Sequence, residues 1–167
     1  MMEHLEMNLE RLQALVQDRK VKELKEVFEE YNIVDLAEMA GDLSIEEALF
    51  IFKVIDKNIS GELFSYLPNE KQQRLIQLLT GDQIKEILDH VYSDDIVDFL
   101  EELPANMVKD ILKHASKQQR DNINKLLSYP EYSAGSIMSI NYIELQEADT
   151  VAEAMQKIKK SGGKVER

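Results

Sequence analysis

"LTGDQIKEILDHVYSDDIVDFLEEL", residues 79–103, contains two successive copies of a twelve-residue apolar pattern. Each copy begins at a single apolar residue and carries a pair of large apolar residues eight positions later. The single positions are Leu79, Val91 and Leu103, and the pairs are Ile87/Leu88 and Phe99/Leu100. Each pair precedes the next single position by three and four residues, the spacing of one face of an α-helix.

The same register extends through most of the chain. Apolar residues occupy every twelfth position: Leu43, Ile55, Leu67, Leu79, Val91, Leu103, Ala115 and Leu127. The pairs are Ile51/Phe52, Leu63/Phe64, Leu75/Ile76, Ile87/Leu88, Phe99/Leu100, Ile111/Leu112 and Ile123/Asn124, of which Asn124 alone is polar. Twelve residues make about 3.3 turns, so in one continuous helix the apolar face would rotate by roughly 120° per copy. The helix must therefore break in every copy.

Residues that end or begin helices lie near the start of several copies: Gly41, Gly61, Pro68, Gly81, Ser93 and Pro104. They can end one helix or occupy the first turn of the next. The pattern predicts an all-α fold, a superhelical stack of short helices (an α-solenoid) with one apolar interior. Its expected core includes Leu67, Leu79, Phe99, Leu100 and Leu103. An irregular helical bundle with accidental spacing is the alternative.

Two amphipathic patterns precede the repeat. Leu9, Leu12, Leu15 and Val16 form one apolar stripe, and Val21, Leu24, Val27, Phe28 and Tyr31 form a second. Both have the three-and-four spacing of a helix, and Asp18 between them is a candidate N-cap.

The character of the sequence changes after Leu127. "SYPEYSAGSIM", residues 128–138, is rich in small residues and predicts a domain boundary, so we expect a helical domain over 1–128 and a second unit over 129–167. "NYIELQ", residues 141–146, alternates as a short strand, and Asp149-Thr150 is positioned to cap a helix that follows. One strand and one helix cannot bury a core, so the second unit is expected to be incomplete.

Composition limits the function. The formal charge of -12 without a basic stripe argues against nucleic-acid binding and favours cations or basic partners. The lack of cysteine excludes disulfides and fits a reducing compartment such as the cytoplasm. The longest apolar cluster, residues 48–55, is far below the roughly 20 residues of a membrane span. The chain has no phosphate-binding loop or acid/base constellation, so we expect no enzyme activity.

Five acids crowd residues 92–104: Asp94, Asp95, Asp98, Glu101 and Glu102. On a helix, all of them except Asp95 fall within about 100° of arc and are expected to face outward, opposite Ile96, Phe99, Leu100 and Leu103. Outward carboxylates in excess of local bases suit magnesium, which keeps several waters and accepts one or two carboxylates. A merely solvated acidic face is the alternative.

Two segments carry a family resemblance. "YSAGSIMSINYIELQEADTVAEAMQKIKKSG", residues 132–162, is similar to the opening of a cystathionine-β-synthase (CBS) domain. The join "YPEYSAGSIM" after an acidic helical region with "DDIVDFLEELP" resembles the MgtE family of magnesium transporters. The resemblance covers residues 35–160 well and the first 30 weakly.

The resemblance implies a cytoplasmic regulatory module at the membrane: a superhelical N-terminal domain, a CBS pair and a transmembrane pore, assembled as a homodimer. Magnesium bound between the N-terminal and CBS domains would favour a closed pore. Asp94 and Asp98 match the positions of the family's N-terminal carboxylates, Glu62 in "SGELFSYLP" is the preferred third acid, and Asp95 can replace either. Most of the CBS pair and the pore are missing here, so we expect this chain to bind Mg²⁺ weakly and to lack a nucleotide site. A helical-repeat adaptor whose acidic face binds a basic protein is the alternative function.

Overall fold

The computed structural model describes residues 7–130 and 132–161. Ten α-helices follow one another through the first part: α1 (Leu9–Gln17), α2 (Val21–Glu30), α3 (Ile33–Asp42), α4 (Ile45–Val54), α5 (Lys57–Tyr66), α6 (Asn69–Leu78), α7 (Gly81–His90), α8 (Ser93–Glu101), α9 (Ala105–Leu112) and α10 (Lys117–Leu127). A 3-10 turn, η1 (Ala134–Ile137), and a last helix, α11 (Val151–Ser161), complete the described elements.

The twelve-residue period corresponds to a ten-residue helix and a two-residue connection. Its single apolar residues Leu43, Ile55, Leu67, Leu79 and Val91 are the C-caps of α3 to α7. Each therefore lies where one helix ends and the chain turns into the next. The predicted breaks in the helix are confirmed, and they are too short to contain other structure.

Side-chain caps begin several of these helices. Ser44 with Glu47, Thr80 with Gln83 and Ser116 with Gln119 form reciprocal capping boxes at α4, α7 and α10. In such a box the hydroxyl accepts from the backbone three residues on, and the longer side chain accepts from the cap backbone. Pro68 and Pro104 are the N-caps of α6 and α9, as their positions in the repeat predict.

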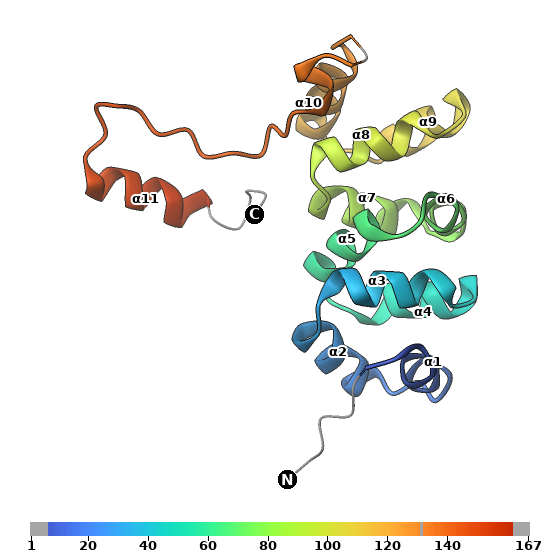
Figure 1. The fold of residues 1–167 in the computed structure, drawn as a ribbon. Helices are drawn as coiled ribbons and strands as arrows, with labels where there is room; N and C mark the ends of the chain where they lie inside the picture. Colours follow the sequence, from blue (N-terminus) through green and yellow to red (C-terminus); the bar gives the residue numbers. More distant parts are fainter. Residues whose placement is uncertain (1–6, 131, 162–167) are drawn as a thin grey trace.

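The helices pack mainly on the second helix along the chain. α3 contacts α5, α5 contacts α7, α4 contacts α6, and α8 contacts α10. Figure 1 shows the result, a stack that runs from α1 and α2 at one end to α10 at the other. The predicted all-α stack of short helices is confirmed.

The core consists of two clusters that meet at α5 and α6. The N-terminal cluster is centred on Leu12, Leu24, Leu36, Ala48, Ile51, Leu63 and Leu75. The C-terminal cluster comprises Phe64, Ile76, Ile84, Ile87, Leu88, Val91, Ile96, Val97, Phe99, Leu100, Leu103, Ile111, Ala115, Ile123 and Leu126. The repeat register predicts this burial well, with four exceptions among its apolar positions. Phe52, Leu79 and Leu112 are only half-buried, and Leu127 is exposed because the stack ends beside it.

Gly61 was predicted to break a helix, and this is wrong. It lies in the interior of α5 and is buried. A Cβ there would lie 2.7 Å from the backbone carbon and oxygen of His90 at the end of α7. The missing side chain therefore lets α5 and α7 approach closely, which is a tertiary requirement that the local sequence does not reveal.

Asp18 is not the N-cap of the second helix. It is the C-cap of α1, and Lys20 precedes α2. Between them, Arg19 has a φ of 54°, and the Lys20 amide donates to the Leu15 carbonyl oxygen at 2.9 Å. This left-handed closure is a common way to end a helix, so α1 and α2 are separated by a helix stop rather than by a side-chain cap.

The C-terminal part contains the predicted helix but not the predicted strand. Residues 141–146 have no regular secondary structure, and no neighbouring strand exists among the described residues to pair with them. Thr150 and Glu153 form the expected cap of α11, with the Thr150 amide donating to Glu153 Oε2 at 2.9 Å. α11 lies apart from the stack (Figure 1). Of the helices in 7–130 and 132–161, none has the length and low charge needed to span a bilayer.

Candidate functional site: the acidic face of helix α8

Helix α8 is held by its apolar face. Ile96, Val97, Phe99 and Leu100 are buried in the C-terminal cluster. The Phe99 ring meets the Phe64 ring of α5 edge to face, with centroids 5.2 Å apart. Such an aromatic pair adds about 0.5–1.5 kcal/mol beyond the buried area. α8 therefore has a fixed orientation, and its acidic residues have fixed positions relative to the stack.

The acids of α8 differ in their exposure. Asp98, Glu101 and Glu102 are exposed, as the helical arc predicts, but Asp94, which the arc also places outward, is not fully exposed. Asp94 and Asp95 lie in the first turn, are half-buried, and interact with neighbouring groups. Carboxylates in a first turn are stabilised by the helix dipole. Asp94 and Asp95 thus interact within the fold, near the start of α8, and the remaining three acids face solvent.

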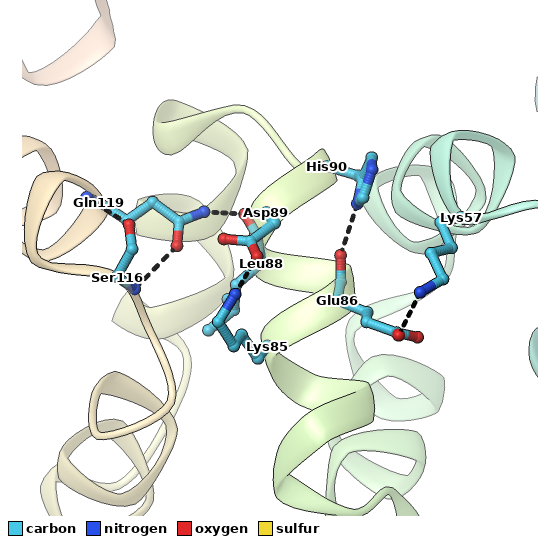
Figure 2. Close-up of polar contacts among 8 residues, drawn as sticks. All are labelled: Lys57, Lys85, Glu86, Leu88, Asp89, His90, Ser116 and Gln119. Atoms are coloured by element: carbon cyan, nitrogen blue, oxygen red, sulfur yellow. Dashed lines mark hydrogen bonds and ion pairs between the residues drawn. The ribbon is translucent and has the colours of Figure 1, made fainter.

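Two of the three acids of the neighbouring helix α7 are paired with lysines, whereas Asp82 is exposed and forms no ion pair with any described residue. Lys57 of α5 contacts Glu86, and Lys85 contacts Asp89 at 2.5 Å (Figure 2). The hydrogen bond that Lys85 donates to Asp89, reinforced by the charge of this carboxylate, raises the pKa of Lys85. In contrast, Asp98, Glu101 and Glu102 form no ion pair with any residue that the structure describes. The unneutralised negative charge is therefore concentrated on α8 rather than on α7.

The end of α7 makes one polar contact within the helix and one with α10. His90 Nδ1 lies 2.7 Å from the Glu86 carbonyl oxygen, and Gln119 of α10 donates to the Leu88 carbonyl oxygen (Figure 2). Gln119 also accepts from the Ser116 amide at 3.1 Å, so one side chain caps α10 and holds α7. Sequence reasoning missed the contact between Gln119 and Leu88 because it joins residues about 30 positions apart, and that separation has meaning only once the stacking of the helices is known.

The predicted metal ligands do not form a closed site within this chain. Glu62 is exposed on α5, whereas Asp94, Asp95 and Asp98 lie on α8. No group of three or more His, Asp or Glu side chains in residues 7–130 and 132–161 is arranged to hold a metal ion. The roles of these four acids remain predictions. An exposed pair of carboxylates is still compatible with a hydrated magnesium ion, which needs few protein ligands.

A small pocket lies beside the Lys57–Glu86 pair. It has a volume of about 110 Å³ and is lined by Phe52, Lys53, Ser60, Leu79, Gln83, Glu86 and Ile87. Pockets that enclose drug-sized ligands are roughly 300–1,000 Å³. This pocket is therefore too small to enclose a nucleotide.

Known proteins resemble this chain over nearly its whole length. The magnesium transporter MgtE of Thermus thermophilus is 28% identical over 156 residues, which cover 90% of this chain and 34% of the transporter. The chain thus spans about a third of the length of that curated relative.

Two crystal structures have a similar fold. One is the cytosolic domain of the Mg²⁺ channel MgtE in complex with ATP, with a TM-score of 0.80 and 26% identity, covering 96% of this chain and 66% of that one. The other is the soluble part of a magnesium transporter, with a TM-score of 0.87 and 20% identity, covering 95% and 63%, and this likeness concerns the fold alone. The family model for the MgtE intracellular N domain matches residues 31–132, more than half of the chain. The resemblance to the MgtE family is confirmed, and this chain belongs to the MgtE intracellular N domain family.

Proposed function

We propose that this chain is the magnesium-sensing cytoplasmic part of a magnesium transporter, and that it regulates ion flux without catalysing a reaction. The observation that supports the proposal is the acidic face of α8, where Asp98, Glu101 and Glu102 are exposed and have no ion-pair partner among the described residues. The similarity to a magnesium transporter supports the choice of ion.

The mechanism depends on repulsion between like charges. With little magnesium, the α8 face and an acidic surface on the following CBS domains would repel each other. Hydrated ions shared between the two surfaces would neutralise this repulsion and favour a compact arrangement. An ion can shift such an equilibrium only through its higher affinity for the compact state, so both surfaces are needed. This chain alone should therefore bind magnesium weakly, with the downstream domains completing the site.

Asp94 and Asp98 are the proposed ligands on α8, with Glu62 as a third acid and Asp95 as a substitute. Asp98 is exposed and one helical turn from Asp94, so both carboxylates can approach an ion from one side. The proposed partners are the CBS and transmembrane domains of the same polypeptide and a second copy in a homodimer. One similar domain was solved with ATP. We propose that a nucleotide site requires the complete CBS pair, so this chain alone should not bind a nucleotide.

The test uses the full-length transporter and limited proteolysis of the segment between the helical stack and the CBS domains. Magnesium should protect this segment in the wild type, and Asp94→Ala with Asp98→Ala should require a higher concentration for the same protection. Asp98→Asn is a milder second variant that leaves the half-buried Asp94 intact. Glu38→Ala with Asp42→Ala is the matched control, because these exposed acids have the same spacing on α3.

Unchanged protection in both α8 variants would mean that these acids are only solvated charges. If protection were instead produced by a basic peptide and not by magnesium, the adaptor function would replace the sensor.

A further inference from the structure

The chain does not leave the helical stack where α10 ends. The Tyr129 amide donates to the Leu126 carbonyl oxygen, and the Ser133 amide donates to the Pro130 carbonyl oxygen, both at 3.1 Å. The Ser136 amide then donates to the Ser133 carbonyl oxygen at 3.1 Å, within the turn η1. η1 itself contacts α10. A stretch with the composition of a flexible linker is thus a series of hydrogen-bonded turns against the last helix.

One close contact fixes this arrangement. A Cβ on Gly135 would lie 2.3 Å from Cδ1 and 2.5 Å from Cγ of the Tyr129 ring. The ring therefore lies directly against the backbone of η1, and only glycine leaves room for it. Because Tyr129 follows α10 and Gly135 belongs to η1, this contact joins the two elements.

The residues that follow η1 bury apolar side chains on the stack. Met138 and Ile140 pack against the C-terminal cluster, whereas Ile137 is 86% exposed. In the same cluster, Ile123 and Leu126 of α10 are buried although α10 is the last helix of the stack. The segment thus covers the apolar side chains at the end of the helical stack, which a further helix would otherwise have to cover.

We propose that residues 133–140 are the end cap of the helical stack, and that the downstream chain pivots beyond Ile140. Residues 142–148 contain no helix or strand, and nearly all of them are exposed. The boundary between the stack and the next unit then lies after residue 140, thirteen residues later than the end of α10 at Leu127. This proposal does not rest on magnesium binding. It concerns which part of the chain moves with the stack.

The test is amide hydrogen exchange on the whole 167-residue chain and on two variants, each of which replaces one isoleucine by aspartate. In the wild type, the amides of Ser133 and Ser136 should exchange at least about tenfold more slowly than those of Glu144 and Leu145. Ile140→Asp should lower this protection at least about tenfold, because it places a charge against the apolar cluster. Ile137→Asp, three residues away on the exposed side, should change it by less than about twofold.

A second pair of variants avoids dependence on Ile140. Gly135→Ala should lower the protection of Ser133 and Ser136 in the wild-type background, and it should have no further effect when Tyr129→Ala has removed the ring. Three results would overturn the proposal: wild-type Ser133 and Ser136 exchanging as fast as Glu144, equal effects of Ile137→Asp and Ile140→Asp, or an effect of Gly135→Ala that does not depend on Tyr129.

Discussion

Replacing Gly61 by alanine tests the packing that sets the spacing of the stack. The added Cβ would lie 2.7 Å from three atoms of His90, whereas ordinary van der Waals contact begins at 3.4 Å. Two of these atoms belong to the His90 backbone, so relief requires α5 and α7 to separate by about 0.7 Å. A gap of that size forfeits roughly a quarter to a half of the attraction across the contact.

Two terms of opposite sign determine the result. Overpacking of a tight contact costs about 1–3 kcal/mol, with the upper part of this range expected where backbone must move. Alanine is about 1 kcal/mol better than glycine inside a helix, which offsets part of the cost. We therefore expect Gly61→Ala to lower the free energy of unfolding by about 1–2 kcal/mol. An exposed glycine in a helix would give the opposite sign.

Gly81→Ala is the matched control. Its Cβ would lie 2.4 Å from Cε1 of His114, but the contact is with the exposed end of a side chain, which can rotate away. We expect a change within about 0.5 kcal/mol. Urea unfolding followed by circular dichroism should show the Gly61→Ala midpoint lowered by about 0.5–1 M, taking a slope near 2 kcal/mol/M. A Gly61→Ala midpoint at or above that of the wild type would refute the argument that α5 and α7 are held at a fixed distance.

Two further predictions concern stability. Leu100→Ala should cost about 2–5 kcal/mol in urea unfolding, because this buried side chain of α8 lies in the C-terminal cluster, and a loss below roughly 0.5 kcal/mol would contradict that placement. Hydrogen bonds from the Gln17 side chain and the Ser44 backbone lower the pKa of Glu47 from 4.5 to about 2. Since the folded-state pKa is the lower one, the ionised Glu47 stabilises the fold above about pH 4.5, and this contribution is lost as the pH falls towards 2. The difference in unfolding free energy between wild type and Glu47→Gln should accordingly shrink over that interval, and a constant difference from about pH 7 to 2 would exclude the linkage.

The fold was predictable because the same twelve-residue apolar pattern, and with it the same short helix, repeats along the chain. Each unit needs one apolar pair for its interior and one apolar residue where the helix ends, so errors at single positions such as Asn124 do not hide the period. The misassigned features are those that depend on distant residues. Gly61 is explained by His90, 29 positions away, and a strand over residues 141–146 needs a partner strand that the described chain does not contain.

The candidate site was predictable to the extent that it follows from one helix. The apolar face of α8 determines which acids point outward, and the exposure of Asp98, Glu101 and Glu102 agrees with the helical arc. Asp94, in the same arc, is half-buried because it lies in the first turn and interacts with neighbouring groups. The neutralisation of Glu86 by Lys57 was not predictable, because it requires knowing that α5 lies beside α7. This pairing is what distinguishes the charge of α8 from the similarly acidic sequence of α7.

The division of the core into two clusters has a consequence for folding kinetics. Each helix contacts partners only a few helices away in sequence, so the chain closes short loops as it folds, which favours rapid folding. Either cluster can serve as the nucleus, because both contain complete helix pairs. Phe64 on α5 links the two halves, because its ring meets those of both Phe52 and Phe99 edge to face, with centroids 6.4 Å and 5.2 Å away. Substitutions at Phe64 should thus reduce the cooperativity of unfolding more than those at either end of the stack, since they uncouple two units that otherwise melt together.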